Sequence, residues 1–329
     1  MKRFSCPVCQ QRTHFKNTLC LNCGTQLAYD PDTASMVALD DARACGNRDL
    51  IDCNWQTEGG GLCECCASSH VIPDLSIPGN LDRWRRLETE KRRLYYSLIA
   101  LGLPRRAPSG KELSFSFLGD QLAPDGSVAQ RVLTGHEDGA ITLNIAEADD
   151  DEREARRVAM GEPYRTLLGH LRHEVGHYYW EVLIRDAGRE AECARLFGDA
   201  NQDYAAALQR HYAEGPPADW EEHFISSYAA AHPWEDWAET WAHILHIVDG
   251  LDTARSHGVD PSGTGLSDAH AIDDAATLLA AWTPVAEALN AMNRSIGHGD
   301  FYPFVIPPPV AAKMDYMLHL IHGQAPAGG

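Results

Sequence analysis

The chain has 329 residues, of which 44% are hydrophobic and 23% are charged, a composition typical of globular proteins. Its formal net charge of −19 argues against attraction of the whole chain to nucleic acid or anionic lipid, because both carry negative charge themselves. No run of 18 or more apolar residues occurs, so we expect no membrane-spanning helix. The first residues are positively charged without a following apolar stretch, which predicts no signal peptide and a cytoplasmic location.

Nine of the ten cysteines lie before residue 67, and this clustering predicts a separate cysteine-rich module whose thiols stay reduced and bind metal. The first predicted site has two Cys-x-x-Cys pairs and consists of Cys6, Cys9, Cys20 and Cys23. The second predicted site consists of Cys45, Cys53, Cys63 and Cys66. Four thiolates suit a structural zinc ion, so we expect two such ions. Cys65 is then a spare thiol, and the alternative is that some thiols of the second set are simply buried.

Residues 80–102 predict a long amphipathic helix, in which Trp84 and Leu94 are among the apolar side chains at helical spacing. Positive charges gather between Arg83 and Arg106. We interpret them as a solvated face with long cationic side chains, and the alternative is contact with a local anionic partner.

The pattern changes after this helix. Alternating apolar and polar residues predict strands at 113–118 and 141–145. From about residue 164 the sequence has helical character almost to its end, with breaks at 215–217, 261–265 and 297–309. We therefore expect an α+β, mostly helical fold with a small sheet.

The segment from His173 to His177 contains the pattern His-Glu-x-x-His. On a helix, two histidines four residues apart emerge from the same face one turn apart, where they can bind one metal ion. Glu174 lies about 100° around the helix from the first histidine, so it can address a metal-bound water instead of the metal. This is the layout of a zinc hydrolase, and the alternative is an ordinary helix that carries two histidines. His170, one turn upstream, is either a support for a ligand or a structural histidine.

A zinc site with two histidines needs a third ligand, and we expect it on a second helix that begins at Pro233. Glu235 and Glu239 share one face of this helix, so one can bind the metal while the other accepts a hydrogen bond from a ligand imidazole. The acidic residues would form a solvated face on an exposed helix. Tryptophans at positions 234, 237 and 241 predict instead that the helix is buried, where carboxylates require partners.

These motifs together resemble the gluzincin branch of zinc metallopeptidases, and the nearest pattern is that of the anthrax lethal factor catalytic domain. The shared features are glycine at position 176, a Glu-x-x-Ala-Glu segment from Glu235 to Glu239, and a tyrosine seven residues before the first of these glutamates. The resemblance implies that His173, His177 and Glu235 bind the catalytic zinc and that Glu174 is the general base. It also implies that Glu239 accepts a hydrogen bond from a ligand imidazole without binding the metal itself, and that Tyr228 stabilises the oxyanion.

The arrangement of the whole chain is similar to a bacterial family called putative zinc-binding metallopeptidases, in which a zinc ribbon precedes such a domain. This similarity implies a zinc ribbon at 1–39, a second cysteine-rich segment at 40–79 and a zincin-like metallopeptidase domain at 80–329. In zincins a strand before the active-site helix forms the upper rim of the cleft and pairs with extended substrate. The stretch from Ile141 to Ala146 resembles that strand.

The sequence therefore predicts a zinc-dependent peptide-bond hydrolase with one catalytic and two structural zinc ions. Its expected partners are a peptide or protein substrate and a protein recruited through the zinc ribbon, without nucleic acid or membrane. One alternative is a non-catalytic adaptor in which the ribbon contacts nucleic acid or protein. Another is a zinc amidase that acts on a modified amide, which the same site chemistry would serve.

Overall fold

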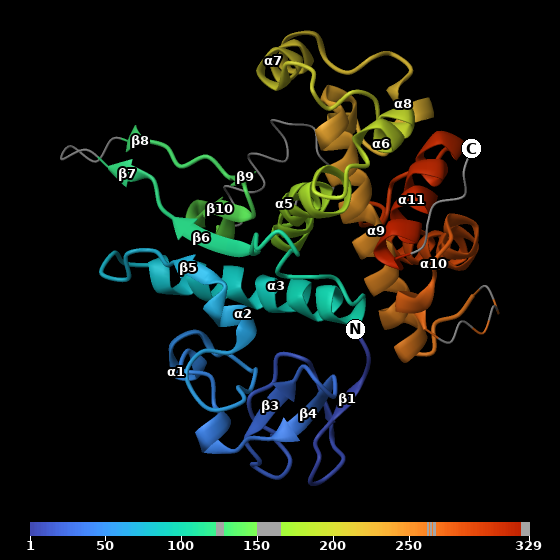
Figure 1. The fold of residues 1–329 in the computed structure, drawn as a ribbon. Coiled ribbons are helices and arrows are strands. Elements are labelled where there is room, and N and C mark those ends of the chain that lie inside the picture. Colours follow the sequence, from blue (N-terminus) through green and yellow to red (C-terminus); the bar gives the residue numbers. More distant parts are fainter. Residues whose placement is uncertain (123–127, 150–165, 262, 264, 266–267, 324–329) are drawn as a thin grey trace. The chain divides into compact units, whose positions relative to one another are not determined.

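The computed structural model describes residues 1–122, 128–149, 166–261, 263, 265 and 268–323 (Figure 1). These residues form two compact units, the first comprising 1–149 with 166–171 and the second starting at Arg172. The secondary structure is mostly helical with small sheets, which confirms the α+β prediction. None of the helices in the described residues combines the length and the apolar character that a membrane span requires.

The first unit opens with short antiparallel ribbons that carry the cysteines. The pairs are β1 (Phe4–Ser5) with β2 (Arg12–Thr13), and β3 (Leu27–Asp30) with β4 (Ser35–Ala38). Short helices follow, namely η1 (Asp41–Arg43), α1 (Arg48–Ile51) and α2 (Glu64–Ala67). The core of this region is aromatic, with ring centroids 4.9 Å apart for Phe15 and Tyr29 and 5.6 Å apart for Phe15 and Tyr96. Since Tyr96 belongs to α3 (Asn80–Ala100), the ribbon packs directly onto that helix.

A four-stranded sheet completes the first unit, in the order β5 (Ser69–Val71), β6 (Ser114–Leu118), β10 (Ala140–Asn144) and β9 (Gly135–Glu137). The first three strands are parallel and β9 is antiparallel. The rings of Tyr95 from α3 and Phe115 from β6 lie 6.3 Å apart, so the helix covers one face of the sheet. A separate antiparallel pair joins β7 (Gln121–Leu122) to β8 (Val128–Gln130).

The sheet corrects one expectation about substrate binding. The segment Ile141 to Ala146 resembles a rim strand that pairs with extended substrate, but β10 pairs with β6 on one side, and its residues 140–142 pair with β9 on the other. Its chain then leaves the sheet, because residues Ile145–Ala148 form the 3-10 helix η2. The edges of the described sheet are therefore β5 and β9, and residues 140–142 have no free edge for an extended substrate.

The second unit is helical throughout its described residues. Helix α5 (Leu167–Trp180) leads into it and continues as a π-helical segment, Glu181–Arg185. The elements that follow are α6 (Glu190–Phe197), α7 (Tyr204–Glu214), α8 (Trp220–His223), η4 (Tyr228–Ala231), α9 (Pro233–Ser256), η5 (Ala269–Ala271), α10 (Ala275–Ser295) and α11 (Pro308–Ile321). Trp237 and Trp241 of α9 are fully buried, as the tryptophan spacing predicts. Helix α9 contacts η4, α6, α10 and α11 and forms the centre of the unit.

A buried ion pair joins the last helix to α9. Lys313 of α11 lies with its Nζ 2.7 Å from an oxygen of Asp236, and both side chains are almost completely buried. The same amine donates a hydrogen bond to the carbonyl of His223 at 2.8 Å. Asp236 is therefore not part of a solvated acidic face, and its cation comes from a residue about 80 positions later in the sequence.

Candidate metal centres

Three side chains from two helices converge on one point in the second unit. Helix α5 presents His173 and His177 one turn apart, and Glu235 lies in the first turn of α9. The Oε2 atom of Glu235 lies 3.0 Å from His173 Nε2 and 3.8 Å from His177 Nε2. One possible ligand atom from each of the three residues lies within 4.8 Å of the others. All three side chains are buried.

These distances fit a zinc ion. Zinc bonds of about 2.1 Å in a tetrahedral arrangement separate the ligand atoms by about 3.4 Å. The two separations between Glu235 Oε2 and the imidazole nitrogens, 3.0 and 3.8 Å, lie on either side of that value. Two imidazoles and one carboxylate also leave a fourth position for water, as in catalytic rather than structural zinc sites.

Gly176 explains how the two ligand-bearing helices come so close. A Cβ atom at this position would lie 2.9 Å from the Cα of Ala238 in α9, which is closer than carbon atoms approach without displacement. The carbonyl of Gly176 also accepts a hydrogen bond of 2.9 Å from the indole of Trp237. The glycine inside the His-Glu-x-Gly-His pattern is thus a contact point between helices, and it fixes the distance between His177 and Glu235.

We expect Gly176→Ala to push α5 and α9 apart, destabilise the chain by about 1–3 kcal/mol and weaken zinc binding at the three-ligand site. Gly299→Ala is a matched control, because an added methyl group there meets open space. Thermal unfolding and zinc content, measured on both variants, check the prediction. Equal zinc content and stability in the two variants would contradict it.

Glu239 contacts the ring nitrogen of His173 that does not face Glu235. Its Oε1 lies 2.8 Å from His173 Nδ1, and its Oε2 accepts a hydrogen bond of 2.7 Å from the hydroxyl of Ser226. An acceptor at Nδ1 keeps the proton on that nitrogen and directs the lone pair of Nε2 toward Glu235 and the metal position. Glu239 therefore lies where the sequence places a carboxylate that orients a ligand, and Ser226 is an additional contact that the sequence pattern does not reveal.

The charges around this point favour a cation. Burial lowers the pKa of His173, yet Glu235 and Glu239 overcome this effect and raise it well above its ordinary value. Burial raises the pKa of Glu235, but His177 and His173 together with a hydrogen bond from Tyr204 bring it down to about 2. The carboxylates are thus arranged to be negative, and a divalent ion between them and the imidazoles would compensate their charge.

Glu174 and Tyr228 lie beside the three-ligand site. Glu174 is almost completely buried and follows His173 directly on α5. Burial lowers the pKa of His177, and the charge of Glu174 is among the influences that oppose this shift, so its carboxylate acts on the same region. The ring of Tyr228 lies 6.0 Å from that of His173. Burial and the charge of Glu235 raise the pKa of Tyr228, which keeps its hydroxyl protonated and able to donate a hydrogen bond.

His170 lies in the first unit and has a different environment. Its Nδ1 lies 2.5 Å from Oε2 of Glu147 in η2, and the other oxygen of Glu147 accepts a hydrogen bond from the hydroxyl of Thr134. These contacts join the start of α5 to the end of β10. They favour the structural interpretation of His170 over a role in supporting a ligand.

Tyr204 is a site residue that the sequence analysis missed. It is the first residue of α7, and its hydroxyl donates a hydrogen bond of 2.7 Å to Glu235 Oε1. A tyrosine 31 positions before its partner gives no periodic signal. The single hint in the sequence is Asp203, whose side chain caps α7 and marks the start of a helix.

The eight predicted cysteine ligands form two clusters in the first unit, the sets Cys6, Cys9, Cys20, Cys23 and Cys45, Cys53, Cys63, Cys66. Zinc–sulfur bonds of about 2.3 Å in a tetrahedral arrangement place sulfur atoms about 3.8 Å apart. The measured Sγ–Sγ distances are 3.7 Å for Cys6–Cys23 and 3.6 Å for Cys9–Cys20. In the second cluster they are 3.7 Å for Cys53–Cys63 and 3.6 Å for Cys53–Cys66. Both clusters therefore fit a zinc ion bound by four sulfur atoms.

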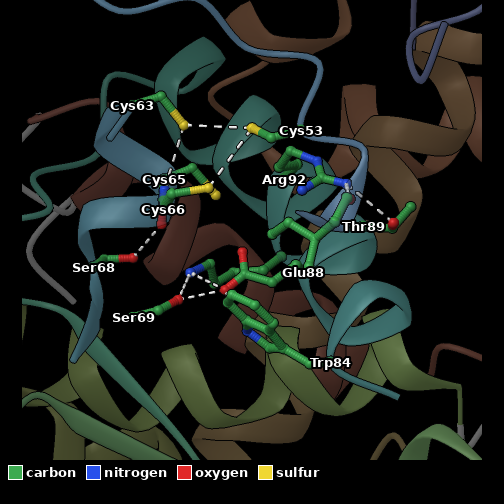
Figure 2. A network of polar contacts seen from close by, with 12 residues as sticks. Cys53, Cys63, Cys65, Cys66, Ser68, Ser69, Trp84, Glu88, Thr89 and Arg92 are labelled. Carbon is green, nitrogen blue, oxygen red and sulfur yellow. Dashed lines mark hydrogen bonds and ion pairs between the residues drawn. The ribbon is translucent and has the colours of Figure 1, made fainter. Parts of the chain in front are cut away.

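The second cluster lies next to a group of buried charges on α3, which Figure 2 shows. Lys91 and Glu88 form a fully buried ion pair of 3.1 Å, and the Glu88 carboxylate also accepts hydrogen bonds from Ser69 and from the indole of Trp84. Arg92 is buried as well. The interpretation of the basic segment as a solvated face is therefore wrong for Lys91 and Arg92.

The cysteine cluster explains why cations are buried at this place. Burial lowers the pKa of Lys91, but Glu88, Cys65 and Cys66 raise it above its ordinary value. The pKa of Arg92 is likewise raised against burial, with Cys53 as the largest opposing influence. A zinc ion with four thiolates carries a net charge of about −2, which the two buried cations would offset. Cys65 is buried beside them and remains outside the ligand set.

Comparison with known proteins gives two family matches along the chain. Residues 80–320 match the model of a family described as "Putative zinc-binding metallo-peptidase", and residues 3–77 match a zinc-ribbon domain. The chain is 43% identical, over an alignment of 338 positions, to "Uncharacterized protein Mb2598c" of Mycobacterium bovis and "Uncharacterized protein Rv2568c" of Mycobacterium tuberculosis. These alignments cover 99% of this chain and 97% of each relative. No solved structure matches the chain. The chain therefore belongs to the family of putative zinc-binding metallopeptidases, with a zinc ribbon at its amino-terminal end.

Proposed function

We propose that the chain is a zinc-dependent peptidase that hydrolyses peptide bonds with a metal-activated water. The observation that carries this proposal is the convergence of His173, His177 and Glu235 from two helices, with Glu239 behind His173. The ligand set leaves one position for water. The His-Glu-x-x-His motif comes first in the chain, and the glutamate ligand follows on a separate helix. This order supports a gluzincin-like metallopeptidase site.

Two residues beside the three-ligand site, Glu174 and Tyr228, have roles in the proposed reaction. Zinc in this site would lower the pKa of its water and polarise the carbonyl of the substrate. Glu174 takes the proton from the water and later passes it to the leaving amine. The protonated hydroxyl of Tyr228 donates a hydrogen bond to the negative oxygen that develops on the carbonyl.

We propose that the zinc ribbon recruits a protein, either the substrate or a partner that presents it. In the first cluster, the turn within each Cys-x-x-Cys pair exposes an apolar side chain, with 63% of Val8 and 91% of Leu21 accessible to solvent. Apolar residues on rigid, metal-held turns suit contact with another protein. The negative net charge of −19 supports a protein rather than a nucleic acid as the partner.

The experiment that tests this function compares the wild type with Glu174→Gln in an extract of cells that lack the protein, with new protein amino termini mapped afterwards. Glutamine keeps the size of the side chain but cannot take the proton, so we expect cleavages with the wild type and a loss of about 10²–10⁴-fold in the variant. Zinc content should be equal in both, because Glu174 is not a ligand. Identical amino termini in the two samples would contradict peptidase activity and favour the amidase or the adaptor.

A further inference from the structure

The carboxylate of Glu235 has two oxygen atoms in different environments. Oε2 faces the nitrogen atoms of His173 and His177 at 3.0 and 3.8 Å. Oε1 instead accepts a hydrogen bond of 2.7 Å from the hydroxyl of Tyr204. A carboxylate can bind zinc through one oxygen or through both, and the hydrogen bond to Oε1 favours binding through Oε2 alone.

The segment that carries Tyr204 follows the first turn of α9 closely. A Cβ atom on Gly198 would lie 3.2 Å from Pro233 Cγ, and the carbonyl of Gln202 lies 3.4 Å from Nε2 of His232. The ring of Tyr204 then lies against those of His232 and Trp234, with centroid distances of 5.2 and 5.8 Å. These successive contacts hold the hydroxyl at Glu235.

The ring and the hydroxyl of Tyr204 differ in their exposure to solvent. The residue as a whole is 37% exposed, so its ring contributes little to a closed hydrophobic core. The hydroxyl is directed toward the buried carboxylate. The hydroxyl is the donor in this contact, because an ionised carboxylate can only accept a hydrogen bond.

We propose that Tyr204 is a positioning residue of the metal site, which holds Glu235 so that only Oε2 binds zinc and the fourth position stays available for water. This inference rests on the proposed function, because it assumes that Glu235 is a zinc ligand. It adds to that function a residue outside the His-Glu-x-x-His helix and outside the glutamate helix.

The test measures metal binding and does not depend on peptidase activity. A chelator first removes the ion from the site with nitrogen and oxygen ligands, while zinc stays in the two cysteine clusters. Zinc affinity of the emptied site is then measured by competition, and cobalt(II) is added in a parallel sample as a spectroscopic probe. The variants are Tyr204→Phe and, as a matched control on the same helix, Tyr212→Phe, whose side chain is 58% exposed.

We expect Tyr204→Phe to lower the zinc affinity of this site by about 10–100-fold, the usual effect of removing a residue that orients a ligand. We also expect weaker visible absorption from bound cobalt, because the released Oε1 joins the ion and raises its coordination number. Tyr212→Phe should match the wild type in both measurements. A residue that only stabilised α7 would change the unfolding temperature but leave the cobalt spectrum unchanged.

Two results would overturn the inference. If Tyr204→Phe binds zinc with wild-type affinity and gives the wild-type cobalt spectrum, Tyr204 does not position Glu235, and the proposed function is unaffected. If the wild type itself takes up neither zinc nor cobalt after the chelator step, both the inference and the proposed function fail. The two failures are thus distinguished by the wild-type titration.

Discussion

Replacement of Glu235 by alanine is expected to reduce the zinc content from three ions per chain to two and to abolish hydrolysis. The three ions correspond to the three ligand groups of the structure, two with four cysteines and one with His173, His177 and Glu235. Without Glu235 the third group retains two imidazoles, too few to hold zinc against a chelator. Metal analysis after dialysis against a mild chelator measures the loss.

The control for this prediction is Glu287→Ala, which removes an exposed glutamate from α10 and should leave three ions. Folding of the Glu235→Ala variant is checked by circular dichroism, because the change also leaves the Tyr204 hydroxyl without its acceptor. If the folded variant retains all three ions, Glu235 is not a ligand. The third position would then belong to another side chain.

Local spacing explains why so much of the metal site was predictable from the sequence. His173 and His177 share a helix face, as do Glu235 and Glu239, and the periodicity of a helix alone places each pair one turn apart. Tryptophans around the glutamates correctly indicated burial. Six of the eight cysteine ligands were predictable for the same reason, since a tight turn brings the two thiols of a Cys-x-x-Cys pair together, whereas Cys45 and Cys53 lack that spacing.

Contacts between distant segments were not predictable, because no periodicity links their residues. Tyr204 reaches Glu235 from a different helix, and Lys313 neutralises Asp236 from the end of the chain. The parallel pairing of β6 with β10 likewise depends on a crossover that local patterns do not reveal. It places β10 inside the sheet instead of at its edge, which leaves residues 140–142 without a free edge for the substrate.

The basic helix shows how one pattern can serve two physical purposes. Arg93 lies on the surface, where it is 39% exposed and pairs with Glu90 one turn away, as the solvated-face interpretation predicts. Lys91 and Arg92 instead point into the first unit beside the cysteine cluster. All three side chains are cationic. Those that face the zinc-binding segment are buried, and the sequence pattern alone does not show which ones they are.

Lys91→Met is expected to destabilise the first unit by about 3–5 kcal/mol, because removal of one partner leaves the other charge buried without compensation. The remaining charge, Glu88, would lie close to the second cluster, whose sulfur atoms are negative thiolates when they bind zinc. Zinc should consequently leave the second cluster faster. Hydrogen exchange of the α3 amides measures the stability, and the rate of zinc release to a thiol reagent measures the second effect.

Two further variants separate this charge effect from simple loss of packing. The double variant Lys91→Met/Glu88→Gln removes both charges and keeps an acceptor for the Trp84 indole, so it should recover much of the stability, since a neutral pair of similar volume is often tolerated. Arg93→Met on the exposed face should cost no more than about 1 kcal/mol. If the double variant is as unstable as Lys91→Met, the buried charge is not the cause. The role of Lys91 would then be packing against Phe115 and Phe117, whose ring centroids lie 5.2 and 5.6 Å from its amine.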